Sequence, residues 1–439
     1  MVALLTIANA SAFVDRYVLG LLVGPLRRDL AISDVQISLL MGLPFAIFYT
    51  ALGLPIGRLA DRTSRRAIIA WSVAAWSVMT MLCGAARSFG ALLAARIGVS
   101  VGEAGLTPPA YSMISDAFPP ERLSTAMSVF SIGIFLGAGF ANVFGGAVVL
   151  MAGTDLAWTL PLVGALKPWQ AIFVMVGAPG LLIALLMRTV PEPPRHAPVG
   201  ATPETDRTEL RTFLRAHWKT LGTVTLAVSF FAAVNTGVAG WLPTFFNRTY
   251  GWTAAEAGLV AGLLTMTVGV AGAVFSGWWA DRLRARGVAD ANLVVFIVGS
   301  VAMGVLAAIF PLMPTGRSAA AVLALVNFPA AFPFGVAAAA IAEVTPNRLR
   351  AQVSALFLFV LSLVGSSLGP TAVAVLTDYA FHDDASLRYS LSIVAAAGHV
   401  CATACMVGAR RGYRAMRAQQ GPLAIFPPET MNPRFPDGY

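Results

Sequence analysis

Long apolar segments dominate the pattern of hydrophobic and polar positions along this chain. Runs of 20 or more mostly apolar residues recur throughout, separated by short polar stretches. Such a run is long enough for a helix to cross a hydrocarbon layer about 30 Å thick. The pattern predicts twelve membrane-spanning helices, at residues 2–24, 35–59, 67–86, 89–114, 123–150, 168–188, 219–246, 256–280, 291–312, 319–342, 351–377 and 389–409.

Proline interrupts several of these predicted helices. A proline lacks the backbone N–H and clashes with the preceding turn, so a break or kink is expected near each one. Such breaks are tolerated in a membrane bundle where neighbouring helices or cavity water satisfy the freed backbone groups. The interrupting residues are Pro44, Pro55, Pro108, Pro109, Pro329 and Pro333.

The composition agrees with a membrane protein. The chain is 57% hydrophobic and only 12% charged, whereas a soluble domain carries about 25% charged residues. Its three cysteines fall in apolar segments and are interpreted as packing residues, with no disulfide or metal site. Asp15 and Arg16 in the first apolar run, which lacks a cleavage site, indicate a retained helix and not a signal peptide. The fold class is therefore predicted to be an all-α polytopic membrane protein.

The net charge is +9, and the basic residues are distributed unequally between the loops on the two sides of the membrane. With the amino terminus inside, the inner loops and the C-terminal tail hold 20 of the 30 basic residues, and the outer loops hold seven. Basic residues concentrate on the cytoplasmic side of membrane proteins, so both termini are predicted to be cytoplasmic. No nucleic-acid partner is needed to explain the charge. The predominance of Arg over Lys, 28 to 2, is typical of a GC-rich bacterial genome, which favours the bacterial inner membrane.

A hydrophilic linker divides the chain into two similar halves. The predicted domains are residues 1–188, a linker with a short amphipathic helix at 189–218, residues 219–410, and a tail at 411–439. The motif Gly57–Arg66 in the first half resembles Gly277–Arg286 in the second, and its Asp61 lies 220 residues before Asp281. Two pseudo-symmetric bundles of six helices are the architecture of alternating-access transporters.

The same residues resemble the major facilitator superfamily. Its inner-loop signature is matched at Gly57, Leu59, Ala60, Asp61, Arg62, Arg65 and Arg66, with Ser64 where glycine is usual. Within it the chain looks most like the spinster group of lysolipid and sphingolipid transporters, through Asp15–Arg16, Arg96 and Gly102–Glu103–Ala104, with Ser100 departing from a common glycine. The resemblance implies a bacterial member of this group, acting as a monomer on a lysophospholipid or sphingoid phosphate.

Three charged residues inside the predicted helices, Asp15, Arg96 and Glu103, are the candidate coupling site. Arg96 and Glu103 are seven residues apart, which places them on one helical face. Helix rise puts Arg96 about 10 Å, Asp15 about 15 Å and Glu103 about 21 Å below the outer membrane boundary. We expect Arg96 to be shared by both carboxylates, with Glu103 as the main proton carrier and Asp15 as a second one. The alternative is a static buried ion pair that fixes helix packing.

Five further residues are predicted to contact the substrate. Arg16 is the candidate anchor for an anionic head group, because its planar guanidinium suits phosphate or carboxylate. Its alternative role is to bind Asp15 or a carbonyl within the protein. Tyr111 is a candidate aromatic wall. Polar residues of the second half, which are alternatively hydrogen bonds between helices, are Asn235, Thr236 and Asn327.

Charged residues at the inner ends of the helices are predicted to form an inner gate. They would hold the inner side shut when the transporter opens outward; the alternative is that they only anchor the loops. In the first half they are Asp61, Arg62, Arg65, Arg66 and Asp116, and in the second half Asp281, Arg282, Arg284 and Glu343.

No motif for catalysis is present in the sequence. We find no phosphate-binding Gly-Lys-Ser/Thr loop, no metal-ligand spacing and no nucleophile beside a base. The predicted function is therefore a secondary active transporter with no cofactor, driven by a proton gradient and carrying an amphipathic lipid-like substrate. A carrier of a drug or small organic anion is the alternative within this class, and a channel or a non-transporting receptor is the alternative outside it.

Overall fold

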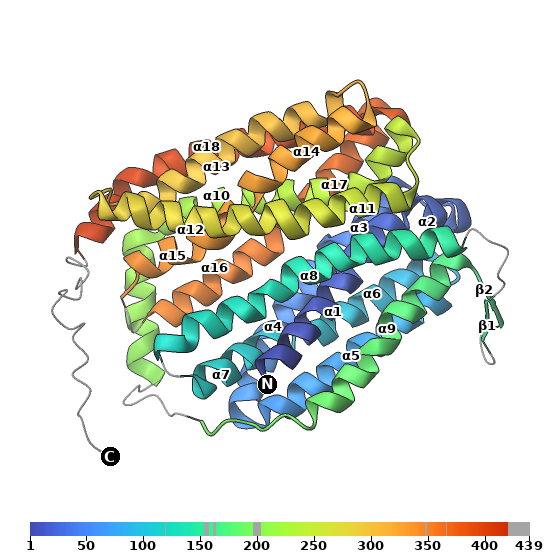
Figure 1. The fold of residues 1–439 in the computed structure, drawn as a ribbon. Helices are drawn as coiled ribbons and strands as arrows, with labels where there is room; N and C mark the ends of the chain where they lie inside the picture. Colours follow the sequence, from blue (N-terminus) through green and yellow to red (C-terminus); the bar gives the residue numbers. More distant parts are fainter. Residues whose placement is uncertain are drawn as a thin grey trace, which may run out of the picture.

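The computed structural model describes residues 1–118, 120–152, 158–160, 164–195, 203–346, 349–365 and 367–419. Nearly all of these residues are helical, and the helices run along one common direction in an elongated bundle (Figure 1). A two-stranded antiparallel hairpin is the exception, in which Trp158 pairs with Leu166. The predicted all-α class is confirmed.

The first half comprises nine helices and the hairpin among the described residues. Their bounds are α1 (Val2–Leu21), α2 (Val23–Leu30), α3 (Asp34–Met41), α4 (Leu43–Arg62), α5 (Arg65–Ala85), α6 (Phe89–Glu103), α7 (Thr107–Ala117), α8 (Pro120–Ala152), β1 (Trp158–Leu160), β2 (Gly164–Leu166) and α9 (Pro168–Met187).

The second half begins with a helix of 48 residues, α10 (Pro203–Tyr250). The elements that follow are α11 (Ala254–Leu264), the π-helical turn η1 (Thr265–Gly269), α12 (Val270–Ala285), α13 (Ala291–Ile309), the 3₁₀ turn η2 (Phe310–Leu312), α14 (Gly316–Ala330), α15 (Phe332–Val344), α16 (Arg350–Gly365), α17 (Leu368–Val375), the π-helical turn η3 (Leu376–Phe381), the 3₁₀ turn η4 (Asp384–Ser386) and α18 (Leu387–Gln419).

The two halves form separate bundles that pack side by side (Figure 1). In the first half α1 packs on α8, and α5 packs on α6 and α9; in the second half α10 packs on α16 and α18. The halves meet through α8 on α11, α3 on α17, α1 on α10 and α4 on α16. This arrangement confirms the prediction of two bundles of six spans.

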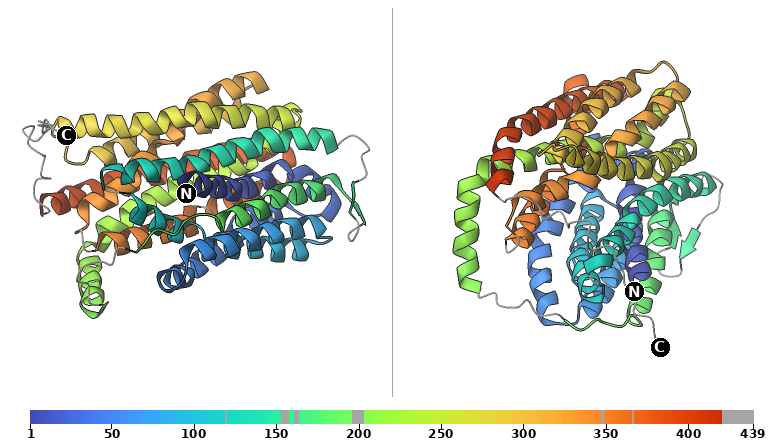
Figure 2. Two further views of the ribbon diagram at one scale, coloured as in Figure 1. Left: turned by 60° about the horizontal axis from the view of Figure 1, so that its bottom comes forward. Right: turned by 60° about the vertical axis from the view of Figure 1, so that its left-hand side comes forward.

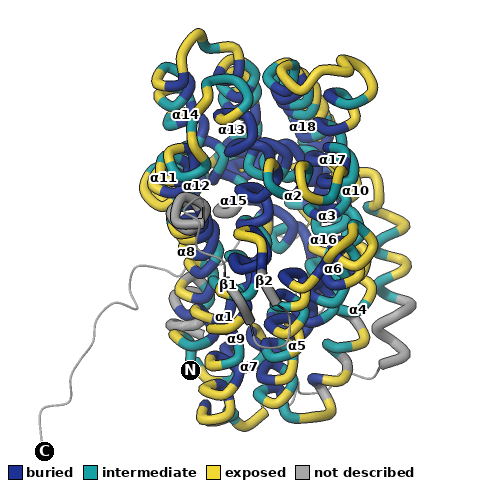
Figure 3. The backbone as a smooth tube through the Cα atoms, turned by 90° about the vertical axis from the view of Figure 1, so that its right-hand side faces the viewer, coloured by how far each residue is buried: buried dark blue, intermediate teal, exposed yellow. Residues whose placement is uncertain are grey.

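Ten helical segments of the described residues are long and apolar enough to cross a membrane. The other two predicted spans correspond to α8, which has an apolar stretch at Val129–Gly145, and to the broken pair α14 and α15. Large apolar side chains such as Trp71, Val274 and Val400 are exposed on the outside of the bundle. Buried segments concentrate where the helices face one another (Figure 3). An apolar exterior of this kind is suited to lipid.

Most predicted proline breaks are present. The second span divides into α3 and α4 beside Pro44, the fourth into α6 and α7 before Pro108, and the tenth into α14 and α15 between Pro329 and Pro333. Pro55 differs, because α4 continues through it. An interior proline is accommodated where the freed carbonyl finds another partner.

The predicted amphipathic helix of the linker is continuous with the seventh span. Its residues form the first turns of α10, which project beyond the bundle (Figure 2). Leu210, Phe213 and Leu214 pack partly against the core, while Trp218 is exposed beside Lys219. An exposed tryptophan next to a basic residue is typical of a membrane–water interface.

Glycines allow α1 and α8 to approach closely. A Cβ at Gly133 would lie 2.7 Å from the carbonyl oxygen of Thr6. A Cβ at Gly137 would overlap the carbonyl oxygen of Ala10 and lie 2.7 Å from Cβ of Phe13. Because neither backbone can move without shifting a whole helix, this contact sets the position of α1 within the first half.

We therefore expect Gly137→Ala to destabilise the protein by about 1–3 kcal/mol, the usual cost of overpacking a close contact. The measurement is the midpoint of thermal unfolding in detergent. Gly222→Ala in α10 is the matched control, because no atom lies within 4 Å of the added Cβ. Equal effects of the two substitutions would contradict this role for the α1–α8 contact.

Candidate functional site

Glu103 is the last residue of α6, at the break that separates it from α7. The neighbouring glycines lie against α5: a Cβ at Gly102 would lie 2.7 Å from Trp76, and one at Gly105 would overlap Ser72. The Glu103 side chain is 1% exposed. The close packing of α6 on α5 therefore places the Glu103 carboxylate where the helix is interrupted, inside the apolar bundle.

Arg16 of α1 holds this carboxylate. Its Nε donates to Oε2 of Glu103 over 2.7 Å, and its Nη2 lies 2.6 Å from the same oxygen. The other oxygen, Oε1 of Glu103, is buried and has no hydrogen-bond partner among the described residues. The prediction that Arg96 is shared by both carboxylates is therefore wrong, because Arg16 forms the ion pair.

Arg96 instead binds backbone carbonyls. Its Nη1 donates to the carbonyl oxygen of Asp15 over 3.1 Å, and its Nε donates to that of Leu40 over 3.4 Å. Its guanidinium also lies 5.6 Å from the ring centroid of Phe45. Arg96 thus connects α6 to α1 and α3, and its charge remains near the buried Asp15 side chain.

Asp15 is a second buried carboxyl group. It is almost fully buried, and its Oδ1 has no hydrogen-bond partner among the described residues. Nη2 of Arg96 is likewise buried without a partner in this part of the chain. A buried polar atom without a hydrogen bond costs free energy, so such atoms are rare in folded proteins. Where one is present, a functional role is a common explanation. The two orphaned carboxyl oxygens are places where a proton can bind.

Three aromatic rings surround Arg16. Its guanidinium carbon lies 4.9 Å from the ring centroid of Phe13, 4.7 Å from that of Phe45 and 5.1 Å from that of Tyr49. Despite the rings and the ion pair, the Arg16 side chain keeps 28% of its surface exposed. Arg16 thus links a buried carboxylate to accessible space.

A small cavity of about 100 Å³ lies between the two halves. The first half contributes Tyr17 and Asn142, and the second half contributes the predicted Asn235 and Asn327 together with Thr265. Hydroxyl and amide groups among apolar walls are typical of a ligand site. Asn142 was not predicted, because it lies in a segment that the sequence analysis treated only as apolar.

Two other predicted substrate residues lie elsewhere. The Thr236 hydroxyl donates to the carbonyl oxygen of Gly365 over 2.7 Å, and so connects α10 to α16. Tyr111 does not line this central cavity; its ring stacks edge-on against Phe130 with centroids 5.5 Å apart. In this structure Thr236 therefore has the alternative role, which is a hydrogen bond between helices.

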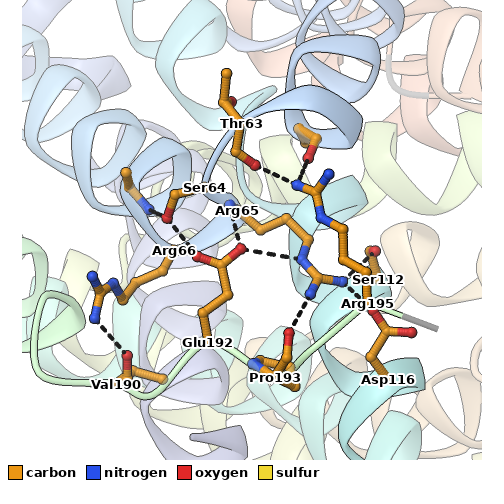
Figure 4. Close-up of polar contacts among 12 residues, drawn as sticks. Thr63, Ser64, Arg65, Arg66, Ser112, Asp116, Val190, Glu192, Pro193 and Arg195 are labelled. Atoms are coloured by element: carbon orange, nitrogen blue, oxygen red, sulfur yellow. Dashed lines mark hydrogen bonds and ion pairs between the residues drawn. The ribbon is translucent and has the colours of Figure 1, made fainter. Parts of the chain in front are cut away.

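The predicted cytoplasmic end of the bundle, which carries the Gly57–Arg66 and Gly277–Arg286 motifs, holds a network around Arg65 (Figure 4). Nη1 of Arg65 donates to Ser112 over 2.9 Å and forms an ion pair with Asp116. Its Nη2 donates to the carbonyl oxygen of Pro193 over 2.7 Å. The expected contact between the signature motif and Asp116 is present, and it lies within the first half.

The start of the linker closes this network. Glu192 accepts hydrogen bonds from the Ser64 hydroxyl and from the backbone N–H of Arg65. Burial opposes ionisation of Glu192, but these hydrogen bonds outweigh it and hold its pKa below the usual range. Arg66 donates to the carbonyl oxygen of Val190 over 3.2 Å, and Arg195 donates to that of Thr63 (Figure 4). Sequence reasoning missed Glu192 because nothing in a proline-rich linker indicates where it docks.

The other predicted residues of the first cluster contribute less. Arg62 is exposed, and the side chain of Asp61 lies outside the described residues. In the second half Arg282 stacks 5.6 Å from the ring centroid of Trp278. Arg284 lies between Asp281 and Glu343, at 2.6 Å from each carboxylate. These contacts again lie within one half.

The end of α18 adds a second network at the predicted cytoplasmic end. Glu343 accepts a hydrogen bond from Tyr413 over 2.9 Å and lies 3.1 Å from Arg417. The buried Asp290 binds Nε of Arg410 at 2.6 Å and Nη2 of Arg414 at 3.0 Å. The sequence analysis assigned these arginines to topology and to a tail, whereas α18 continues as a helix to Gln419.

At the opposite, predicted external end, ion pairs join the two halves. Asp34 of α3 is 0% exposed and accepts bidentate hydrogen bonds from Arg248 of α10, at 2.6 and 2.8 Å. Arg27 of α2 lies 3.3 Å from Asp34 and 2.5 Å from Asp384. The backbone N–H of Val35 donates to Asp378, again across the halves. Among pairs of fully described residues, the ion pairs that join the halves lie at this end.

Sequence reasoning missed this external ion-pair network, which consists of Arg27, Asp34, Arg248 and Asp384. Both arginines were counted only as outer-loop charges. Opposite charges in three separate outer loops were the available signal, but spacing along the sequence does not pair them.

Comparisons with known proteins agree with this architecture. The family model of the Major Facilitator Superfamily matches residues 5–370. An "MFS-type efflux pump" of Mycolicibacterium smegmatis is 30% identical over 418 residues, covering 94% of this chain and 92% of that protein. "Protein spinster homolog 3" of Danio rerio is 27% identical and covers 86% of this chain and 76% of that protein. A crystal structure of a bacterial homolog to the human lysosomal transporter spinster, inward-facing and unoccupied, matches with a TM-score of 0.75 at 27% identity, covering 95% and 96% of the two chains.

We expect Asp290→Asn to weaken the attachment of α18 and to lower stability by about 1–3 kcal/mol near neutral pH, as for loss of a charged hydrogen bond. Burial opposes ionisation of Asp290, but Arg410 and Arg414 outweigh it and hold its pKa below the ordinary value. A lowered pKa stabilises the fold above the ordinary value of about 3.9, and this contribution is lost as the pH falls through the lowered pKa.

The measurement is thermal unfolding in detergent at several pH values. The difference between wild type and Asp290→Asn should be constant near neutral pH and shrink only below about pH 4. Asp281→Asn is the control, because that carboxylate is exposed and its ion pair should contribute little. A deficit that already disappears at mildly acidic pH would contradict the assignment.

Proposed function

This chain belongs to the major facilitator superfamily, and we propose that it is a proton-coupled secondary active transporter of an amphipathic, lipid-like substrate. Membership of the family makes the protein a membrane transporter and not an enzyme. The proton, the substrate class and the roles of individual residues are our proposal. It acts as a monomer, without a cofactor, and by alternating access of the two halves.

One observation carries the proposal: Arg16 is the hydrogen-bonding partner of the buried Glu103 and is itself 28% exposed. Glu103 occupies Nε and Nη2 of the planar Arg16 guanidinium, and the anionic group of the substrate is proposed to bind this same edge. An anionic group of the substrate and Glu103 therefore compete for Arg16. When the substrate takes Arg16, Glu103 becomes a buried charge without a partner and must bind a proton.

This competition couples substrate to proton in both directions. Protonation of Glu103 releases Arg16 for the substrate, and binding of the substrate favours protonation of Glu103. By thermodynamic linkage each event strengthens the other by the same factor. Arg16 itself stays charged throughout, because a guanidinium does not lose its proton in proteins.

Asp15 and Arg96 support the same site. Asp15 is a second proton acceptor, because its Oδ1 is buried without a partner among the described residues. Arg96 compensates the charge of Asp15 and fixes the backbones of α1 and α3 beside Glu103. Its proposed role is therefore to stabilise the site, while Arg16 exchanges partners.

The lipid-like substrate is what the resemblance to the spinster group implies; the relatives support that resemblance, and the surroundings of Arg16 suit such a substrate. A charged guanidinium among three aromatic rings suits a molecule with an anionic head and an apolar body. Asn235, Asn327 and Asn142 line the central cavity and are proposed to contact the substrate there. Tyr111 of α7 is proposed as an aromatic contact away from this cavity. The cavity of about 100 Å³ is small for a lipid, so the halves must separate to admit one.

A drug or small organic anion is the second candidate substrate. It is favoured by the relative described as an efflux pump, which covers nearly the whole chain. An apolar cavity wall accommodates a hydrophobic drug as well as an acyl chain. A direct comparison of how tightly lipids and drugs bind distinguishes the two candidate substrate classes.

Alternating access assigns roles to the two ends. The external ion-pair network joins the halves, so this structure corresponds to a state closed at the predicted external end. The inner-gate residues are proposed to act at the other end, where α4, α5, α7, α12 and α15 carry them. The excess of basic residues in the inner loops supports an orientation in which both termini lie in the cytoplasm of a bacterium.

We expect Glu103→Gln to abolish proton-driven transport while the folded protein still binds substrate. The amide keeps the size of the side chain but cannot exchange a proton. Transport into proteoliposomes is measured with and without a pH gradient, and Glu256→Gln, a change outside the site at the start of α11, is the control. Unchanged pH-driven transport in Glu103→Gln would refute the assignment.

We expect Arg16→Ala to lose selective binding of anionic amphiphiles. Thermal stabilisation is compared across lysolipids, sphingoid phosphates and drugs, and a loss of about tenfold or more in affinity corresponds to one charged hydrogen-bonded pair. Arg317→Ala, an exposed arginine at the start of α14, is the control. Equal stabilisation of wild type and Arg16→Ala by the anionic ligands would contradict the anchor role.

A further inference from the structure

A second cavity, of about 770 Å³, opens at the predicted external end. The first half contributes the end of α1, the helix α2 and the turn before α3, and the second half contributes the end of α10, the start of α11 and η4. Figure 3 views the molecule from this end and places α2 between α11 and α17. We name this cavity the external vestibule. Its volume is in the range of a site for a small ligand.

The floor of the vestibule is closed. A Cβ at Gly20, which lines the cavity, would lie 2.8 Å from the carbonyl oxygen of Gly240 in the other half. The two backbones are thus in contact below the opening. The vestibule is therefore open to the outside and closed at its inner end, and it is separate from the central cavity and from Arg16.

The charges that line the vestibule are unbalanced. Three arginines, Arg27, Arg28 and Arg248, face a single carboxylate, Asp384. Asp34 lies behind them and binds both Arg27 and Arg248. Of the charged side chains that line the vestibule itself, three are positive and one is negative.

Arg28 is the arginine of this set that has no partner among the described residues. Arg27 and Arg248 form ion pairs with Asp34 and Asp384, whereas Arg28 has no ion pair or hydrogen bond within the described part of the chain. Nη1 of Arg28 lies 3.8 Å from the position of a Cβ on Gly24, another residue that lines the cavity. The guanidinium thus folds back along α2 into the vestibule.

The remaining lining residues suit an anion. Ser33, Thr244 and Asn247 provide hydroxyl and amide groups at the same cavity. Asp384 is 53% exposed, so its ion pair with Arg27 can be exchanged for one with an external anion. An anion that bridges Arg28 and Arg27 would occupy the place of the Asp384 carboxylate.

We propose that the external vestibule is an anion-binding site, in which Arg28 and Arg27 hold a phosphate or carboxylate group in competition with Asp384. Such an anion loosens one of the contacts that join the halves at this end. Occupancy of the vestibule therefore favours opening of the external side. This site goes beyond the proposed transport function and does not depend on proton coupling at Glu103.

The test is saturable stabilisation by inorganic phosphate. Thermal unfolding of the full chain in detergent is followed as phosphate replaces chloride at constant ionic strength, which keeps general screening equal. We expect Arg28→Gln to raise the apparent dissociation constant for phosphate about tenfold, as for loss of a charge-assisted contact. Arg28 has no described partner to lose, so this variant should fold normally.

Two further variants make the result specific. Asp384→Asn should lower the dissociation constant severalfold, because it removes the competing carboxylate. Arg317→Gln, an exposed arginine elsewhere at this end, should leave it unchanged. Stabilisation that does not saturate, or that is equal in Arg28→Gln and wild type, would overturn the proposal.

A second experiment, in lipid bilayers, identifies the source of the anion. The protein is placed in nanodiscs of phosphatidylcholine or of phosphatidylglycerol. If stabilisation by phosphatidylglycerol requires Arg28, the vestibule binds a lipid head group. If soluble phosphate stabilises the protein in phosphatidylcholine and this requires Arg28, the anion comes from solution. Absence of an Arg28-dependent effect in both membranes would overturn the proposal.

Discussion

The ion pair between Arg16 and Glu103 is the interaction on which the interior of the first half depends. A lone charge at the centre of a bilayer costs at least about 2.5–3.5 kcal/mol, so neither residue is acceptable without the other. The pair joins α1 to the break between α6 and α7. Its geometry leaves Oε1 of Glu103 without a donor among the described residues, which is the opposite of what a purely structural pair requires. A site that is paired but incompletely satisfied can change its protonation state.

The two ends of the molecule use charge differently. At the predicted external end, Asp34 and Asp384 receive arginines from both halves, so the charges hold the halves together. At the predicted cytoplasmic end, Arg65 and Arg284 bind carboxylates of their own half. Charges that stay within a half brace each bundle as a rigid unit. Such bracing suits a mechanism in which two rigid bundles rock about a central site.

Two segments that look like simple connections are part of this bracing. The start of the linker is held by Arg65 through Glu192 and Pro193. The end of α18 is held through Asp290 and Glu343. Both attachments lie at the predicted cytoplasmic end, where the inner-gate residues also lie. Movement of the halves must therefore carry the linker and the end of α18 with it.

The sequence by itself determined the number and order of the spans, the twofold repeat and the breaks beside Pro44, Pro108 and Pro329. These features depend on local chemistry: the length of apolar runs and the missing N–H of proline. It also indicated a coupling site at Asp15, Arg96 and Glu103 and a separate substrate anchor at Arg16, because charges in apolar helices are rare and must have partners.

Only the tertiary structure decided which of these charges are partners. Helix rise estimates depth, but the rotation of α1 against α6 is set by contacts far along the chain, such as Gly137 of α8 against α1. That rotation directs Arg16 to Glu103 and leaves the Asp15 carbonyl to Arg96. The external ion-pair network escaped prediction for the same reason: its four residues come from four separate segments, and packing of the halves brings them together.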